Sequence, residues 1–251
     1  MGRLDGKVAI VTGGGSGLGQ GIAVLFAKEG ADVVIIGRRK EVLEETCKLE
    51  PNKISYVEGD ITKEESIKNL VEYVNKKFGK LDILVNNAGV SSPATIKDLN
   101  MSIYDKIFNL DVRALVNVTI ECLPLIIKSK GNILNISSVT SSLCQPGMSM
   151  YSGAKAAINN FTKCWALELA KDGVRVNAIT PGAIDTKIFS VSRNSEEQAN
   201  KFKDYILKHI PWGRFGTPEE VGNLALFLVS NEASYITGSI YSIDGGINPY
   251  S

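Results

Sequence analysis

The sequence predicts a single α/β domain built on a doubly wound parallel sheet, and three observations predict it. Short apolar runs alternate with longer amphipathic segments along the whole chain. The apolar runs are continuous rather than alternating with polar residues, as in strands that are covered on both faces. The 251 residues, 44% of them hydrophobic and 22% charged, are enough for one core, and no linker, repeat or low-complexity segment divides residues 1–251.

Seven short runs rich in Val and Ile are the expected strands. Branched side chains favour extended structure, and polar residues or glycines bound the runs. In chain order the runs are 8–12, 32–36, 53–57, 82–86, 132–136, 174–179 and 239–243.

Longer segments between the strands are the expected helices, near 18–29, 40–50, 63–78, 102–128, 152–171 and 218–229. Thr217 followed by Pro218 is a good start for the last one. A polar stretch near 186–217, rich in Ser, Asn, Lys and Glu, is either a surface loop or a lid. We expect a substrate lid, because the neighbouring motifs lie at the carboxyl ends of strands, where such sheets bind ligands.

Charge and composition exclude several classes of function. The net charge of +1 gives no electrostatic hold on nucleic acid or on an anionic membrane. The amino terminus has no signal-peptide pattern, Gly6 breaks the myristoylation pattern, and no apolar run is long enough to span a membrane. We therefore expect a cytoplasmic protein with neither nucleic acid nor membrane as a partner.

Metal ligands are sparse. The chain has one histidine, His209, and four scattered cysteines without a CxxC pair, namely Cys47, Cys122, Cys144 and Cys164. Zinc sites need clustered ligands, so we expect no metal and reduced thiols.

The stretch TGGGSGLG at 12–19 follows the first expected strand and opens the first helix. Gly13, Gly17 and Gly19 let the backbone turn tightly and approach a pyrophosphate, whose charge favours the amino end of a helix. A plain glycine-rich turn is the alternative, since a lone glycine motif is weak evidence. Its place between strand and helix favours the dinucleotide site of a Rossmann-like sheet.

The end of the second strand reads IIGRRK. NAD-binding proteins usually keep an acidic residue about 20 positions beyond the glycine turn for the ribose 2′-hydroxyl. Gly37 stands there instead, followed by Arg38 and Arg39, and two guanidinium groups suit a 2′-phosphate. A solvated helix start is the alternative. We expect NADP(H), with NADPH used far better than NADH.

Residues 151–155 read YSGAK, and Tyr151 and Lys155 therefore share one helix face. The small residues between them leave room for a flat cofactor. A nearby ammonium lowers the pKa of a phenol, and a shift of roughly three units needs about 4 kcal/mol. A surface pair is the alternative, but the other motifs favour proton chemistry.

At this point the residues resemble the short-chain dehydrogenase/reductase family, almost from end to end. TGGGSGLG is similar to that family's cofactor turn, and NNAG at 86–89 to its fourth-strand motif. NISS before YSGAK is similar to its catalytic Ser and Tyr-x-x-x-Lys pair. PGAIDT at 181–186 and SIDGG at 242–246 resemble its nicotinamide-side turn and its closing strand.

The resemblance implies site residues position by position. The catalytic set would be Asn109, Ser138 rather than Ser137, Tyr151 and Lys155. Asp60 and Ile61 would lie along the adenine, and the Ile184 backbone and Thr186 would meet the carboxamide. The full set of cofactor-binding residues would be Gly13, Ser16, Gly17, Leu18, Gly19, Arg38, Arg39, Asp60, Ile61, Asn87, Ala88, Gly89, Tyr151, Lys155, Pro181, Gly182, Ile184 and Thr186.

The implied reaction is hydride transfer between NADP(H) and a ketone, aldehyde or alcohol. Tyr151 would give the oxygen its proton in reduction and take it in oxidation, while Ser138 donates a hydrogen bond to that oxygen. A 3-ketoacyl-carrier-protein reductase is the main alternative, with Lys128, Lys130 and Lys171 as candidate contacts for an acidic carrier, although Asp172 among them weakens that case. Sugar, polyol and steroid dehydrogenases stay open. A non-catalytic nucleotide-sensing protein is the remaining alternative.

The substrate wall and the assembly are less clearly marked. Residues between Ser138 and Tyr151 suit a mainly apolar wall or plain packing, namely Leu143, Cys144, Gln145, Met148 and Met150. Trp212 and Phe215 could close over substrate or anchor the loop. The helices at 102–128 and 152–171 carry apolar residues on more than one face, which predicts association; these residues are Leu115, Val118, Phe161, Trp165 and Leu169. The family commonly forms tetramers, so we expect a homotetramer.

Overall fold

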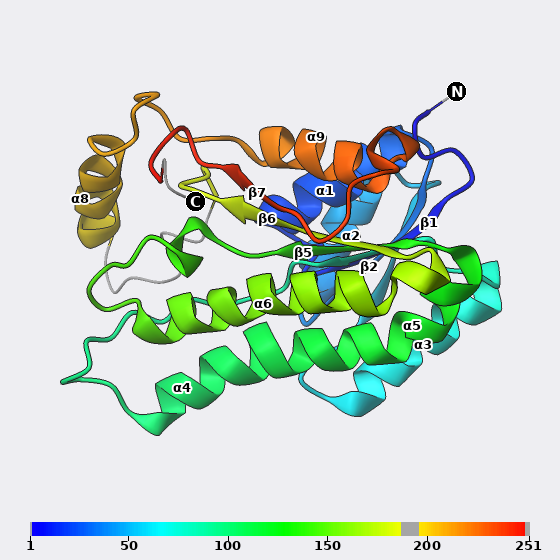
Figure 1. Cartoon of the computed structure of the whole chain (residues 1–251), viewed down its shortest axis with the longest axis horizontal. Helices are drawn as coiled ribbons and strands as arrows, with labels where there is room; N and C mark the ends of the chain where they lie inside the picture. Colours follow the sequence, from blue (N-terminus) through cyan, green and yellow to red (C-terminus); the bar gives the residue numbers. More distant parts are fainter. Residues whose placement is uncertain (1, 187–195, 249–251) are drawn as a thin grey trace.

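The computed structural model describes residues 2–186 and 196–248. It contains one seven-stranded sheet in which every pairing is parallel, in the order β3-β2-β1-β4-β5-β6-β7 (Figure 1). The strands are β1 (Val8–Thr12), β2 (Asp32–Gly37), β3 (Ile54–Glu58), β4 (Ile83–Asn86), β5 (Asn132–Ile136), β6 (Arg175–Pro181) and β7 (Ile240–Ile243). The predicted doubly wound parallel sheet is confirmed. Its strand order reverses between β1 and β4, where such sheets bind ligands.

The helices also follow the predicted order. They are α1 (Gly17–Lys28), α2 (Lys40–Leu49), α3 (Glu64–Phe78), α4 (Met101–Ile107), α5 (Leu115–Ser129), α6 (Ser149–Glu168), α8 (Glu196–Leu207) and α9 (Pro218–Val229). Short helical segments are the π-helical η1 (Phe108–Ala114) and the 3-10 turns η2 (Val139–Ser141), η3 (Ala170–Asp172) and η4 (Asn231–Ala233). The single helix expected at 102–128 is therefore two helices joined by a π-helical segment.

Helices cover the sheet on both faces (Figure 1). One apolar cluster joins the sheet to α1, α2 and α9, and a second joins it to α3, α5 and α6. Within β1, Ala9 and Val11 belong to the first cluster, and Val8 and Ile10 belong to the second. Because both faces of each central strand are buried, the strand sequences read as continuous apolar runs.

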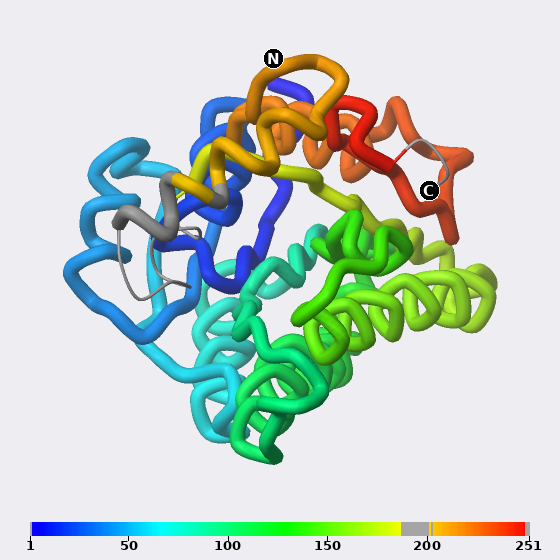
Figure 2. The backbone as a smooth tube through the Cα atoms, turned by 90° about the vertical axis from the view of Figure 1, so that its left-hand side faces the viewer, coloured from blue at the N-terminus to red at the C-terminus, as the bar shows by residue number. Residues whose placement is uncertain are grey.

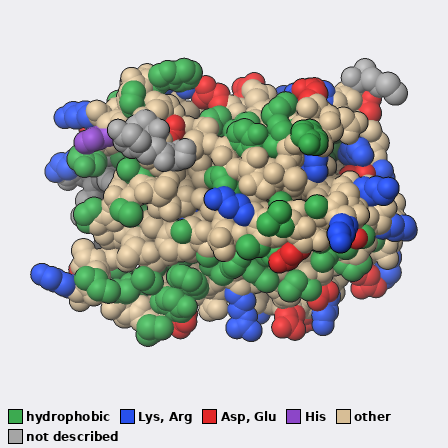
Figure 3. Space-filling model, viewed as in Figure 1, with side chains coloured by type: hydrophobic (Ala, Val, Ile, Leu, Met, Phe, Trp, Pro, Cys, Tyr) green, Lys and Arg blue, Asp and Glu red, His purple; other side chains and the backbone are tan. Residues whose placement is uncertain are grey.

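Of the apolar residues that predicted association, Phe161, Trp165 and Leu169 are half-buried, and Trp165 and Leu169 pack against the second cluster. Leu115 and Val118 are 4% and 0% exposed and pack in the core, so the prediction that they form an outer face is wrong. Ile120 on α5 and Leu167 on α6 are instead 59% and 81% exposed. Figure 3 shows apolar side chains gathered on the side of the molecule where α4, α5 and α6 lie.

The polar stretch at 186–217 contains a helix that the sequence did not predict. Helix α8 stands beyond the carboxyl ends of the strands, and Figure 2 looks onto that edge. An isolated parallel bridge between Ile184 and Gly216 closes the base of the segment. Residues 187–195 of the expected lid lie outside the described residues.

Candidate functional site

The glycine turn connects β1 to α1 and has the backbone that its sequence predicts. Gly13 and Gly17 have φ values of +66° and +57°, which favour glycine. A side chain at Gly19 would clash with the Asn87 side chain and the Gly13 carbonyl. Ser16 precedes α1 without a side-chain cap, and the first turn of α1 has no acidic residue. The backbone N–H groups at this helix start therefore suit an anion.

Thr12 joins the glycine turn to the turn after β4. Its hydroxyl accepts hydrogen bonds from the backbone N–H groups of Asn87 and Ala88 at 2.9 and 3.0 Å. The Asn87 side-chain amide donates to the Thr12 carbonyl at 2.8 Å. The structure thus brings Asn87, Ala88 and Gly89 beside the glycine turn, at the strand-order reversal.

The ends of β2 and β3 lie side by side on the other side of the glycine turn. Arg38 and Arg39 follow β2 and are exposed, while Asp60 and Ile61 follow β3. Burial favours a higher pKa for Asp60, but hydrogen bonds from Thr62 and the charge of Arg38 lower it below its usual value. Arg38 and Asp60 are therefore electrostatic neighbours at this edge.

Two serines follow β5, and their hydroxyls have different partners. The buried Ser137 hydroxyl donates to the Lys155 carbonyl at 3.0 Å and so anchors α6. The Ser138 oxygen accepts hydrogen bonds from the Thr140 N–H at 3.2 Å and its hydroxyl at 3.0 Å. Since Ser138 accepts both bonds, its own proton remains to be donated, which favours Ser138 over Ser137 as the reactive serine.

Helix α6 carries Tyr151 and Lys155 one turn apart, as expected. Lys155 Nζ lies 5.5 Å from the centroid of the Tyr151 ring. Lys155 is 4% exposed and donates to the Ile136 carbonyl at 3.1 Å, whereas Tyr151 is half-buried. The structure brings Ser138, Tyr151 and Lys155 together.

Asn109 does not join this group, because its side chain is exposed. Two residues further along η1, Asp111 is 0% exposed and lies beside the lysine. Asp111 Oδ2 lies 3.4 Å from Lys155 Nζ, and Asp111 Oδ1 accepts a hydrogen bond from the Val90 N–H at 2.8 Å. The structure thus places Asp111, and not Asn109, beside Lys155.

The sequence did contain a signal for Asp111. Asp111, Leu115, Val118 and Cys122 recur at helical spacing, and all four are buried. A carboxylate on the apolar stripe of a helix is uncommon unless it is paired. The resemblance instead implied Asn109, two residues earlier.

Burial and charge act in opposite directions on the proton-carrying groups. Burial raises the pKa of Tyr151 above its usual value, and the Asp111 carboxylate adds to the rise. The Lys155 ammonium and a side-chain hydrogen bond with Ser138 oppose the rise. Burial favours a lower pKa for Lys155, but Tyr151 and Asp111 hold it above its usual value. The sequence instead predicted a lowered Tyr151 pKa, from the charge of the neighbouring ammonium. Among the protein's own groups, burial is the stronger effect.

The turn after β6 completes the edge. Pro181 ends β6, and the Gly182 N–H donates to the Ile243 carbonyl at 2.9 Å. Ile184 is 6% exposed, and a side chain at Gly17 would lie 3.6 Å from the Thr186 methyl group. Thr186 therefore lies over the glycine turn.

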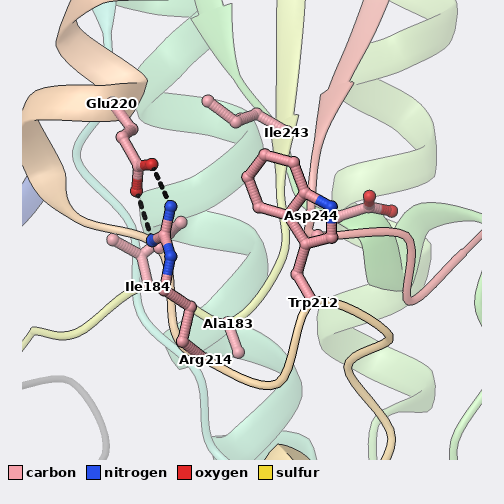
Figure 4. Close-up of a pocket in the computed structure, with 9 residues that line it drawn as sticks. Ala183, Ile184, Trp212, Arg214, Glu220, Ile243 and Asp244 are labelled. Carbon is pink, nitrogen blue, oxygen red and sulfur yellow. Dashed lines mark hydrogen bonds and ion pairs between the residues drawn. The ribbon is translucent and has the colours of Figure 1, made fainter.

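Figure 4 shows a hollow beside this turn, at the carboxyl ends of β6 and β7. Its lining residues are Ala183, Ile184, Trp212, Arg214, Gly216, Glu220, Ile243, Asp244 and Gly245. Arg214 and Glu220 form a two-point ion pair, with 2.6 Å between Nη2 and Oε1. Trp212 is 72% exposed at the rim. Tyr151 is not among the residues that line this hollow.

The described residues contain no group of three or more His, Cys, Asp or Glu side chains that could hold a metal ion. His209 lies in the turn after α8, with Nδ1 bonded to the Tyr205 carbonyl at 2.7 Å. None of the helices within residues 2–186 and 196–248 is long and apolar enough to cross a membrane.

The fold and the glycine turn together define a doubly wound dinucleotide-binding protein. Comparison with known proteins narrows this class. A family model described as enoyl-(acyl carrier protein) reductase matches residues 13–248. The chain therefore belongs to the short-chain dehydrogenase/reductase family, and it is an oxidoreductase that uses a nicotinamide cofactor.

Individual relatives are similar over nearly their whole length. A 3-oxoacyl-[acyl-carrier-protein] reductase FabG of Thermotoga maritima is 40% identical, over 98% of this chain and 99% of that protein. A (+)-borneol dehydrogenase 2 of Salvia officinalis is 36% identical, over 97% of this chain and 90% of that protein. A short-chain dehydrogenase/reductase of unknown function from Caenorhabditis elegans, solved with cofactor, superposes with a TM-score of 0.92 at 36% identity and covers 98% of this chain and 96% of that one.

Proposed function

We propose that the protein is an NADP(H)-dependent oxidoreductase that interconverts a ketone or aldehyde and an alcohol, with Tyr151 as the acid and base. The observation that carries the proposal is the convergence of the Ser138 hydroxyl, the Tyr151 phenol and the buried Lys155 ammonium at the carboxyl edge of the sheet. These three groups supply a proton, a hydrogen bond to oxygen and a fixed positive charge.

The residues fit a nicotinamide dinucleotide. The close packing at Gly13 and Gly19, and the uncapped start of α1, suit a pyrophosphate. The exposed Arg38 and Arg39 at the end of β2 suit a 2′-phosphate, and no carboxylate stands at Gly37 to favour the 2′-hydroxyl instead. When bound, the cofactor supplies or accepts the hydride, and its oxidised ring carries a positive charge.

The chain's own residues then manage the proton. In reduction, Tyr151 gives the hydroxyl proton to the carbonyl oxygen, and Ser138 donates a hydrogen bond to the same oxygen. Lys155 stabilises the phenolate that Tyr151 leaves behind. Because burial raises the pKa of Tyr151, the phenol is protonated at neutral pH, which suits a proton donor. We assign no part in this machinery to Asn109, which is exposed, because Asp111 is the residue of this segment that lies beside Lys155.

A 3-oxoacyl-carrier-protein reductase is the second candidate. Relatives with that name from Thermotoga maritima and Chlamydia muridarum, 40% and 36% identical, favour it. The basic residues suggested by the sequence do not favour it. Lys128 in the last turn of α5 and Lys130 after it precede the amino end of β5, and Lys171 in η3 precedes the amino end of β6. Within the single chain these lysines lie at the edge of the sheet opposite Ser138, which does not support them as carrier contacts beside the proposed catalytic group.

The test is NADPH oxidation by the purified chain with a panel of ketones, aldehydes, sugars, steroids and 3-ketoacyl thioesters. We expect turnover with at least one carbonyl compound, and the preferred compound separates the two candidates. Tight NADPH binding without turnover across the panel would contradict the proposal and favour a nucleotide-sensing protein.

A further inference from the structure

A buried ion pair lies behind the proposed catalytic group. Asp111 Oδ2 and Lys155 Nζ are 3.4 Å apart, and the two residues are 0% and 4% exposed. Asp111 Oδ2 makes no hydrogen bond within the described part of the chain, so the ammonium is its one charged neighbour there. A buried carboxylate is costly unless a cation offsets its lost hydration.

The pair also touches the turn that carries Asn87, Ala88 and Gly89. Asp111 Oδ1 accepts from the Val90 N–H at 2.8 Å. A methyl group at Gly89 would lie 2.9 Å from Asp111 Oδ2 and 3.3 Å from Lys155 Nζ. Glycine at this position therefore leaves the room that the pair occupies.

The π-helical segment η1 separates two helices that a regular pattern would merge, and its buried side chains are Asp111 and Ala114. Such segments are rare and frequently lie at functional sites. Here the segment turns the carboxylate of Asp111 inward, while Asn109 stays exposed.

We propose that Asp111 is a positioning residue whose buried carboxylate holds the Lys155 ammonium beside Tyr151 and joins it to the turn at Gly89 and Val90. The role of Asp111 in catalysis rests on the proposed function. The effect of its charge on Lys155 and Tyr151 does not depend on that function. Lys155 and Tyr151 on α6 are the titratable groups that face it, and the Val90 N–H and the Ile136 carbonyl are the polar backbone groups of the cluster.

Removing the negative charge of Asp111 should shift the pKa values of its neighbours in a defined direction. A carboxylate beside an acid opposes loss of a proton, so Asp111→Asn lowers the pKa of both Lys155 and Tyr151, whichever of the two titrates first. Burial raises the pKa of Asp111 above its usual value, and the Lys155 ammonium and the Val90 N–H oppose the rise. The two contacts of the carboxylate, 3.4 Å from the Lys155 ammonium and 2.8 Å from the Val90 nitrogen, suit its charged form, so we take the pair as ionised.

The test is an NMR titration of ¹³C-labelled tyrosine, in which the Tyr151 signal is assigned as the one absent from Tyr151→Phe. We expect Asp111→Asn to lower the Tyr151 pKa by about one unit. Asp105→Asn is the matched control, since Asp105 on α4 is exposed, and it should leave the signal unchanged. Asp111→Ser, also uncharged, provides the same readout if the amide variant folds poorly.

An unchanged Tyr151 pKa in both uncharged variants would overturn the proposal, because Asp111 would then be neutral or merely structural. This titration needs no substrate, so it stands apart from the assay of the proposed function. Where turnover is found, Asp111→Asn should also move the alkaline limb of carbonyl reduction, and the acid limb of alcohol oxidation, to lower pH. A loss of rate without movement of either limb would speak for a structural role.

Discussion

The proposed chemistry depends on how each side chain is held. Ser137 and Ser138 are adjacent and chemically identical, yet one anchors α6 and the other keeps a proton to donate. Lys155 is buried and bonded to the Ile136 carbonyl, so its ammonium is fixed rather than free to move through solvent. The sequence predicted the Tyr–Lys pair from its spacing. It did not predict the sign of the Tyr151 pKa shift, because burial depends on packing that spacing does not reveal.

The proposed preference for NADP(H) also depends on single residues. The double change Arg38→Ala and Arg39→Ala should weaken NADPH binding by at least tenfold, since each hydrogen bond to a charged group is worth about 1.5–3 kcal/mol. NADH binding should be nearly unchanged, because NADH has no 2′-phosphate. Fluorescence titration with both nucleotides measures the effect, and Lys48→Ala, at the far end of α2, is the control. Equal weakening for both nucleotides would argue against 2′-phosphate recognition.

At the scale of elements, strands were easier to predict than the segments around the site. All seven strands were predicted within a residue or two, because the apolar run is the strand itself. The expected helix at 102–128 missed η1, since a π-helical insertion leaves the apolar spacing on either side intact. Helix α8 was missed because its polar composition resembles a loop, although Glu, Gln, Ala and Lys are good helix formers.

Helix α9 begins with the most complete cap among the described helices, and it fixes the end of the expected lid. Thr217 and Glu220 form a capping box, and Arg214 adds an ion pair to Glu220. Hydrogen bonds from Arg214 and the Thr217 backbone lower the pKa of Glu220 to about 2. A depressed carboxyl pKa contributes stability above the unfolded value, and this contribution is lost as the pH falls through the folded value.

Glu220→Gln should therefore lower the thermal unfolding midpoint near pH 7, and the difference from the wild type should shrink as the pH falls from about 4.5 towards 2. The effect should be small, because both partners are partly exposed. Glu219→Gln makes the same chemical change one residue away and should have no such pH-dependent effect. Parallel pH profiles for the two variants would contradict the role given to the cap.

At the scale of the whole molecule, the sequence predicted association, but partly from the wrong residues. Leu115 and Val118 face the core, whereas Ile120 and Leu167 are exposed on α5 and α6. The spacing of apolar residues along a helix shows that the helix has two apolar faces. Which of the two faces stays exposed to solvent depends on how the helix packs against the sheet. The homotetramer stays a proposal, supported by this exposed apolar surface.

Light scattering at micromolar protein concentration tests the proposed homotetramer, and we expect a mass four times that of the single chain. Leu167→Glu should lower the mass by placing a charge in the contact. Leu49→Glu on α2, an equally polar change at a residue 53% exposed, should not. A wild-type protein that is monomeric would contradict the proposal.

The central claim is that the Tyr151 hydroxyl carries the proton of the reaction. Removing only that oxygen, in Tyr151→Phe, should reduce kcat for carbonyl reduction by about 100-fold or more while the dissociation constant for NADPH stays within a few fold of the wild type. A variant that turns over at the wild-type rate would contradict the account.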